Sequence, residues 1–165
     1  MRSLLCALCL FMTVSHTSFA QSFELPKNID LSKPENYNRY EKDVINCVNW
    51  LEKNPASDGK QKDAVKFLIE WVSGCPYITL NVDQRVLPFA EDHPEMLIYF
   101  MGGWTKFALE HKSDTSSVHG TVAGLKSIIK MYKANASAPR DASIDKLVSL
   151  NDKGKLEEWV ATQLK

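Results

Sequence analysis

The sequence has no excess of charge of either sign and few residues that break helices. Its 165 residues include 20 basic and 20 acidic side chains, so the formal net charge is zero. Without a basic excess, the chain has no bulk electrostatic attraction for a phosphate backbone, which argues against nucleic acid as a partner. Only 7 glycines and 7 prolines are present, which argues against a collagenous or low-complexity chain. These absences favour one ordinary globular domain.

No apolar run in the sequence is long enough to cross a lipid bilayer. Residues 4–14 form an uncharged apolar run of 11 residues, whereas a helix that spans a bilayer needs about 20. A later apolar run, residues 96–109, includes Lys106 and is also too short, so it predicts a buried helix. We therefore expect no membrane span in the chain that follows the N-terminal run.

The N-terminal run has the organisation of a secretory signal peptide. Arg2 gives the positive start, and residues 4–14 give the apolar segment. Ser18 and Ala20 then supply small side chains at the two positions that signal peptidase reads. This arrangement predicts that residues 1–20 form a signal peptide that is cleaved before Gln21.

Cleavage at that position would leave 165 − 20 = 145 residues in the periplasm or outside the cell. The alternative, an uncleaved N-terminal anchor, fits less well because the apolar run is short and the polar residues 15–18 follow it directly. Asn135 begins an Asn-Ala-Ser sequence that is an acceptor for N-glycosylation, which matters only for a eukaryotic source.

Apolar side chains recur at spacings of three and four residues over most of residues 34–165, which predicts an all-α fold. We expect residues 21–33 to form an extended arm, and residues 34–165 to form a single domain, a compact bundle of about five to six helices. The first helix is expected to start at an N-cap, Ser32, and to pair with the second in an αα-hairpin. The helix that carries residues 96–109 is apolar almost all round, so we expect it at the centre of the bundle.

Two more helical regions are expected in the C-terminal part of the chain. The first should begin at Asp114 or Ser116, since either side chain can cap a helix. The second should begin at Ser143 and be interrupted at Gly154, because glycine is a poor helix former and favours helix ends.

Residues 77–82 have a different pattern. Ile78, Leu80 and Val82 alternate with polar residues, which is the period of two that is typical of β-structure. The sequence predicts no second strand as a partner, and a lone strand cannot satisfy its own backbone groups. We therefore interpret these residues as a short extended segment that crosses the bundle.

Glycines in the apolar helix need compensation elsewhere in the structure. Gly102 and Gly103 each cost about 1 kcal/mol relative to alanine in a helix interior. Gly120 and Gly124 lie four residues apart and so share one helix face. The favoured interpretation is close packing of two helices, glycine against glycine. The alternative is a ligand-binding groove lined by Gly102, Gly103 and Trp104.

Cys47 and Cys75 are the two cysteines that remain outside residues 1–20. An exported chain meets oxidising conditions, which favours a disulfide between them. A simple hairpin argues against it, because Cys47 would face about position 65, about 15 Å along the helix axis from Cys75. A disulfide needs Cα atoms within roughly 7 Å. A disulfide and two buried free thiols therefore remain alternatives.

The histidines after residue 20 are His93, His111 and His119, and they form no metal-binding spacing such as HExxH, so no metal is expected. His111, Asp114 and His119 belong to residues 110–119, where hydroxyl side chains are also concentrated. These three are the candidate catalytic residues, although such loops usually serve as caps and turns. The sequence has no phosphate-binding loop, nucleophile elbow or dinucleotide fingerprint, so we expect no cofactor.

Four short motifs with aromatic residues carry a resemblance to a group of proteins. They are residues 47–52 (CVNWLE), 67–71 (FLIEW), 100–104 (FMGGW) and 156–159 (LEEW). In these motifs the chain resembles a group of short exported proteins of Gram-negative bacteria to which no activity is assigned. The resemblance implies export and implies no particular chemistry.

These observations together predict an exported helical domain that acts as a non-enzymatic binding or interaction module. Its partner would be a protein or a small molecule, and the sequence predicts no oligomeric state. The alternative is a small periplasmic or secreted hydrolase that uses histidine, serine and acidic residues near positions 110–119.

The predicted cleavage site can be tested on the exported protein. We expect its intact mass to correspond to a chain that starts at Gln21, because Ser18 and Ala20 are small. Ala20→Tyr should block processing, since signal peptidase requires a small side chain there. Ser22→Tyr, on the other side of the cut, should leave processing unchanged. A different N-terminus, or an exported chain of full length, would contradict the prediction.

Overall fold

The computed structural model describes residues 23–55, 59–135 and 140–165, and within these ranges it contains six α-helices and no strand. The predicted signal peptide and the two sequon positions after Asn135 lie outside the described residues. The α-helices are α1 (Glu41–Leu51), α2 (Gly59–Gly74), α3 (Leu97–Glu110), α4 (Ser117–Ala134), α5 (Ala142–Asp152) and α6 (Leu156–Gln163), and the 3₁₀ helices are η1 (Pro34–Tyr40), η2 (Gln84–Val86) and η3 (Pro94–Met96). The predicted all-α bundle is confirmed.

The residues before the first helix pack on the domain and form no helix of their own. Phe23 is buried, with its ring centroid 5.8 Å from that of Trp50. The first helix starts at Pro34 as a 3₁₀ helix, and the predicted N-cap at Ser32 is wrong. The Ser32 hydroxyl instead donates a hydrogen bond of 2.6 Å to Asp30 Oδ1. The Ser32 hydroxyl thus forms a local hydrogen bond with a neighbouring side chain and does not cap the helix.

The first two α-helices form the predicted αα-hairpin. They pack directly on each other, and Cys47 Sγ lies 3.4 Å from the carbonyl oxygen of Ala64, one residue from the position expected to face it. Near the other end of α2, the Trp71 indole Nε1–H donates a hydrogen bond of 3.1 Å to the carbonyl of Tyr37. The apolar stripes of both helices therefore face the interior, as their spacing predicts.

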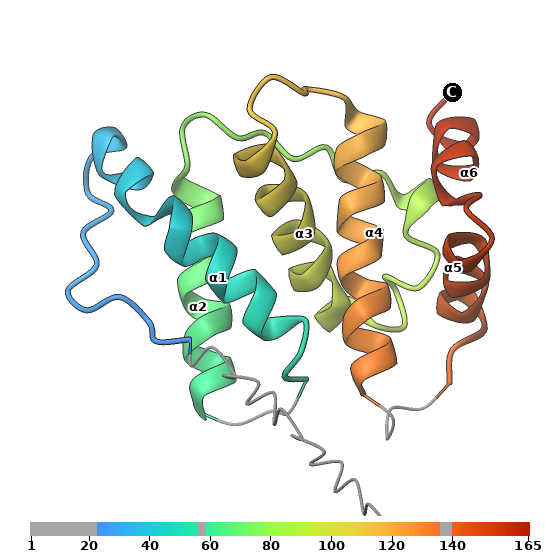
Figure 1. Cartoon of the computed structure of the whole chain (residues 1–165), viewed down its shortest axis with the longest axis horizontal. Helices are drawn as coiled ribbons and strands as arrows, with labels where there is room; N and C mark the ends of the chain where they lie inside the picture. Colours follow the sequence, from blue (N-terminus) through green and yellow to red (C-terminus); the bar gives the residue numbers. More distant parts are fainter. Residues whose placement is uncertain (1–22, 56–58, 136–139) are drawn as a thin grey trace, which may run out of the picture.

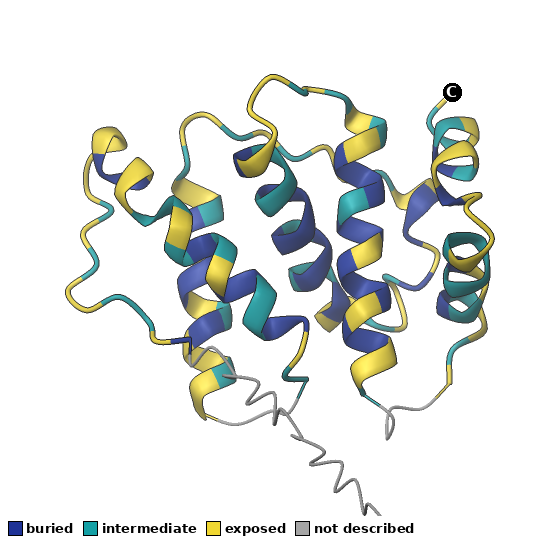
Figure 2. Ribbon diagram, in the orientation of Figure 1, coloured by how far each residue is buried: buried dark blue, intermediate teal, exposed yellow. Residues whose placement is uncertain are grey.

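Helix α3 occupies the centre of the bundle, as predicted. It contacts α1, α2 and α4, and Figure 1 shows it between the α1–α2 hairpin and α4. Buried residues run along most of its length (Figure 2), and they include Phe100, which is fully buried, and Trp104. Helices α5 and α6 cover the other side of α4 (Figure 1). The helix that is apolar almost all round is thus the one with neighbours on most sides.

Glycines permit the close contact between α3 and α4. A Cβ atom on Gly103 would lie 2.5 Å from Ser127 Cβ and 2.7 Å from the carbonyl oxygen of Ala123. A Cβ atom on Gly124 would lie 2.6 Å from the ring of Phe100. Atoms do not approach so closely without displacement, so the two helices meet at this distance because both positions lack a side chain. The interpretation of glycine packing against glycine is confirmed.

Two further glycines each accommodate a particular neighbour. A Cβ atom on Gly120 would overlap the indole of Trp104, which lies directly over this turn of α4. Gly102 faces the opposite direction, where an added Cβ atom would lie 3.1 Å from both Leu68 and Val48. The glycine cost in α3 and α4 is therefore offset by helix contacts on both sides of α3.

The ends of the last helices have the residues that helix termini favour. The Ser116 hydroxyl caps α4 by accepting a main-chain N–H three residues later, at 3.3 Å. Asp141 caps α5 in the same way at 2.9 Å, two positions before the predicted start at Ser143. Gly154 has a φ of 68° and, with Lys155, ends α5 in a Schellman motif. The predicted interruption at Gly154 is confirmed.

Residues 77–82 cross the bundle without helix or strand structure, as predicted. Figure 1 shows the chain leaving α2 and passing the ends of α3 and α4 on its way to η2. Ile78 and Leu80 are half-buried and pack on the core, while Thr79 and Asn81 are exposed. This alternation is that of an extended chain.

The glycine contact predicts a large difference between two glycine-to-alanine substitutions. Gly124→Ala should lower the free energy of unfolding by about 1–3 kcal/mol, because the new methyl group collides with α3. Gly59→Ala is the control: nothing lies within 4 Å of a Cβ atom at that position. Its stability should be unchanged or raised by less than about 1 kcal/mol. Urea unfolding followed by circular dichroism measures both, and equal effects would contradict the account.

Candidate functional site

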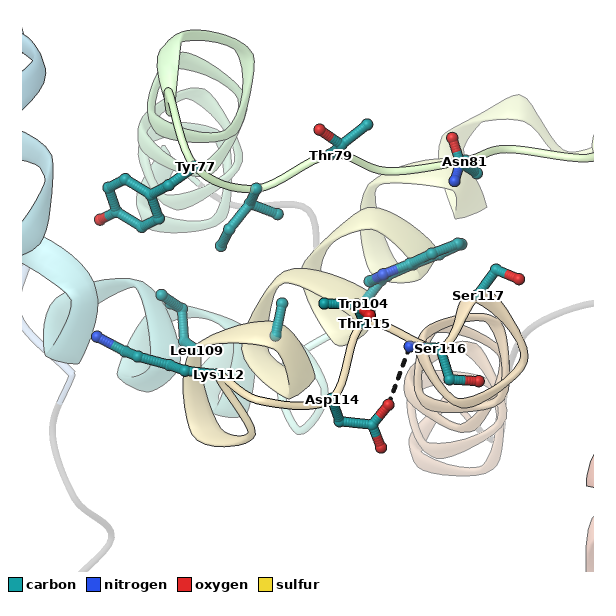
Figure 3. A pocket seen from close by; sticks show the side chains of 12 residues that line it. Tyr77, Thr79, Asn81, Trp104, Leu109, Lys112, Asp114, Thr115, Ser116 and Ser117 are labelled. Atoms are coloured by element: carbon teal, nitrogen blue, oxygen red, sulfur yellow. Dashed lines mark hydrogen bonds between the residues drawn. The ribbon is translucent and has the colours of Figure 1, made fainter.

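A cleft of about 480 Å³ lies where the crossing segment passes the junction between α3 and α4. One wall is residues 77–81, and the other is the end of α3 together with the loop that leads into α4 (Figure 3). The Trp104 indole lies between these walls (Figure 3). The lining residues are Tyr77, Ile78, Thr79, Asn81, Trp104, Ala108, Leu109, Lys112, Asp114, Thr115, Ser116 and Ser117.

Two short-range hydrogen bonds hold the loop between α3 and α4 in place. Asp114 Oδ1 accepts the N–H of Ser116 at 2.9 Å (Figure 3). The Asp114 N–H in turn donates to the carbonyl of His111 at 2.8 Å. Ser116 is the N-cap of α4, so the loop geometry is fixed by the same residues that start the helix. Both predicted starts of this helix, Asp114 and Ser116, thus take part in its capping.

His119 lies between two carboxylates. Its Nδ1 is 2.7 Å from Asp114 Oδ2, and its Nε2 is 3.6 Å from Glu157 Oε1 on α6. Hydrogen bonding by Asp114 is the main cause that raises the pKa of His119 above its ordinary value. The pKa of Asp114 is lowered, first by the N–H of Ser116 and then by His119. The imidazole thus links the start of α4 to α6, and the contact is ionic when the ring is protonated.

The charged groups that line the cleft have internal partners. Lys112 Nζ lies 2.7 and 3.0 Å from the two carboxylate oxygens of Glu41. Asp114 is occupied by His119 and by the N–H of Ser116. The polar groups left to meet a ligand are neutral: the side chains of Thr79, Asn81, Thr115 and Ser117 and the indole N–H of Trp104.

The Trp104 side chain is 6% exposed, yet its indole N–H has no hydrogen-bond acceptor among the described residues. Among the described residues, two side-chain atoms are fully enclosed and have no hydrogen-bond partner, Thr105 Oγ1 and Ser127 Oγ. Trp104 Nε1 is not one of these enclosed atoms, and Trp104 lines the cleft. By contrast, Trp71, which is fully buried, donates its indole N–H to a carbonyl at 3.1 Å. A buried N–H without an acceptor is costly unless water or a ligand supplies one.

The sequence-predicted site residues divide into three groups. Trp104 and Asp114 line the cleft. Gly102 and Gly103 do not, because helix contacts cover them, so the alternative of a groove lined by both glycines is wrong. His111 and His119 lie outside the cleft lining, and the ring of His111 packs on Phe107 with centroids 4.8 Å apart.

The wall formed by residues 77–81 was not a sequence-predicted part of the site. The period of two in this segment indicates extended structure but does not say which helix ends it passes. Its meeting with Trp104 and the loop before α4 depends on the tertiary arrangement. The signal that could have marked residues 77–81 as part of the site is that they form an extended segment without a predicted partner strand.

Cys47 and Cys75 are both unpaired and are not at disulfide distance, so the disulfide alternative is not formed in this structure. Cys47 is fully buried between α1 and α2, whereas Cys75 is half-exposed, so only one of the two is a buried free thiol. Burial raises the pKa of Cys47 to about 12. A thiol of that kind is almost entirely protonated at neutral pH and is a poor nucleophile.

Metal binding and membrane insertion find no support in the described part of the chain. Residues 23–55, 59–135 and 140–165 contain no group of three or more His, Cys, Asp or Glu side chains that could hold a metal ion. Within the same ranges, no helix has both the length and the apolar character that crossing a bilayer requires.

Comparison with known proteins adds no relative. No protein-family model matches the sequence, and no curated protein or solved structure is significantly similar to it.

The His119 contacts predict a measurable pH dependence. The His119 imidazole should titrate above about 6.5, and Asp114→Asn should lower its pKa, because the carboxylate is the main cause of the shift. Asp152→Asn removes a carboxylate that binds Lys133 instead, so it should leave the His119 pKa unchanged. NMR titration of the imidazole protons measures all three proteins.

The pH dependence of the free energy of unfolding should reflect the titration of the same imidazole. Because the folded-state pKa of His119 is raised, its contribution to stability is fully present below the unfolded-state pKa and is lost as the pH rises through the folded-state value. Unfolding measured between pH 5 and 9, a range chosen to bracket about 6.5, should show this loss in the wild type and less of it in Asp114→Asn. An imidazole that titrates at or below its ordinary value would contradict the prediction.

Proposed function

We propose that this protein is a small exported binding module without catalytic activity, whose ligand occupies the cleft beside Trp104. Export is supported by the signal-peptide pattern of residues 1–20 and by the resemblance to exported proteins of Gram-negative bacteria. Binding is supported by the cleft, whose volume of about 480 Å³ lies in the range of roughly 300–1,000 Å³ that ligand pockets have.

The lining indicates an uncharged ligand with both apolar and hydrogen-bonding parts. Ile78, Ala108 and Leu109 supply apolar surface beside the Trp104 ring. Hydroxyl and amide groups surround this surface, and the charges of Lys112 and Asp114 already have partners. The remaining lining groups carry no charge, so a neutral ligand is favoured.

The single observation that carries the proposal is the indole N–H of Trp104. The residue is 6% exposed, it lines the cleft, and its N–H has no acceptor among the described residues. Proteins satisfy buried donors, so a donor left open in a cleft is a place where a ligand supplies the acceptor.

The hydrolase alternative has no specific observation in its favour. Both ring nitrogens of His119 face carboxylates, Asp114 and Glu157. The hydroxyl of Ser116 accepts a main-chain N–H of α4 and does not reach the imidazole nitrogens of His119 within hydrogen-bond distance. A Ser-His mechanism needs the hydroxyl within reach of a ring nitrogen that acts as the base.

A fragment screen tests the proposed function. A library of neutral fragments is screened against the exported protein by NMR, with the Trp104 indole N–H resonance as the reporter, assigned through Trp104→Phe. We expect the hits to shift this resonance, because their acceptors meet the open donor. Ala108→Phe should abolish the shifts, since its ring fills the cleft. Ala142→Phe, on the exposed start of α5, should leave them unchanged.

Hits that bind both variants equally, or a library that never shifts the Trp104 resonance, would contradict the proposal. Hits in the cleft that are also hydrolysed would show that the module is catalytic, and would overturn the non-enzymatic half of the proposal alone.

A further inference from the structure

The wall formed by residues 77–81 and its neighbour Val82 carries main-chain groups that pair with nothing else in the described residues. From Ile78 to Val82, no peptide N–H or carbonyl makes a hydrogen bond to another described residue. The chain here is extended, so every second peptide group points toward the same edge. An unpaired extended edge is a template for another extended chain.

Exposed apolar side chains mark the ends of the same segment. Within the described residues, the large apolar side chains left exposed are Ile69, Tyr77 and Val82. Tyr77 is 48% and Val82 is 52% exposed, and they lie at the two ends of the unpaired main chain. The two positions lie on opposite faces of an extended chain, and a paired chain has side chains on both faces, so it would cover both, and burial of this apolar surface would favour binding.

The opposite wall supplies a donor that suits a peptide carbonyl. Trp104 lines the cleft and its Nε1–H has no acceptor among the described residues, and Thr115 and Ser117 line the same space. Figure 3 shows the Trp104 ring between the segment at Thr79 and Asn81 and the loop at Thr115. A chain that pairs with the segment on one side would thus turn its other side toward the indole.

The paired charges of the lining and the spacing of its main-chain groups indicate which kind of ligand fits. The internal pairing of Lys112 with Glu41 and of Asp114 with His119 leaves no free charge to recognise an ionic group. A repeated ladder of main-chain donors and acceptors matches a second extended peptide, which has the same spacing of about 3.3 Å per residue. The hydroxyl groups of a sugar do not repeat in this way.

We infer that the ligand of the cleft is an extended, uncharged peptide segment of a partner protein, which pairs its main chain with residues 78–82 and accepts a hydrogen bond from Trp104. Its side chains alternate, and apolar ones contact Ile78 and Leu109. The inference rests on the proposed function and specifies its ligand.

The test uses one peptide and two N-methylated analogues of it. The parent is acetyl-Thr-Val-Thr-Val-Thr-amide, which is uncharged and favours extended structure. One analogue is N-methylated at both valines and the other at all three threonines, so each lacks the residue N–H groups of one edge. The exported protein is titrated with each peptide while the Trp104 indole resonance is followed by NMR.

The parent peptide should shift the Trp104 resonance in the wild type and in Ala142→Phe but not in Ala108→Phe. One methylated analogue should bind within about twofold of the parent, and the other should bind at least about tenfold more weakly, because only one edge of the peptide pairs with the segment. Equal binding of the two analogues would overturn main-chain pairing.

Failure of the inference can be separated from failure of the proposed function. If neutral fragments or a neutral disaccharide bind at Trp104 and the peptide does not, the cleft is a binding site but not for a peptide. If neither fragments nor peptide reach Trp104, both proposals fail. Self-association of the chain that Tyr77→Ser abolishes, without peptide binding, would assign the segment to a second copy and overturn the inference.

Discussion

The close contact between α3 and α4 is the constraint on which the rest of this structure depends. Gly103 and Gly124 remove the side chains that would hold the helices apart, and Ser127 and Phe100 fill the space beside them. Because α3 is surrounded by α1, α2 and α4, its distance from α4 sets the position of the other helices. Each glycine weakens its helix locally by about 1 kcal/mol, and close packing along the contact offsets that loss.

The same contact creates the candidate site. Gly120 leaves room for the Trp104 indole against the first turn of α4, so Trp104 is buried there while it also lines the cleft. The loop before α4 is fixed by Asp114 and Ser116, which cap the helix and hold His119. Packing, capping and charge pairing therefore leave one buried donor and one unpaired length of main chain, residues 78–82, on opposite sides of the same space.

Local patterns in the sequence predicted most of the fold and only part of the site. Apolar spacing located the helices and the central place of α3, and four-residue glycine spacing predicted the helix contact, because these depend on neighbours within a turn or two. The N-cap at Ser32 failed because the 3₁₀ helix begins at Pro34 with Lys33 in the N-cap position, and the Ser32 hydroxyl donates to Asp30. The cleft could not be predicted, since it needs residues 77–81 to pass Trp104, and the link from His119 to Glu157 joins distant parts of the chain.

The account rests on an indole N–H that is buried with its ring and yet open to the cleft, and hydrogen exchange measures this directly. Trp71 is the internal reference, because its ring is also buried and its N–H donates to the carbonyl of Tyr37. In the ligand-free protein, the Trp104 indole proton should exchange with water much faster than that of Trp71, under conditions where the fold is fully stable. Equal protection of the two protons would show that Trp104 has an internal partner or is sealed from the cleft, and would contradict the account.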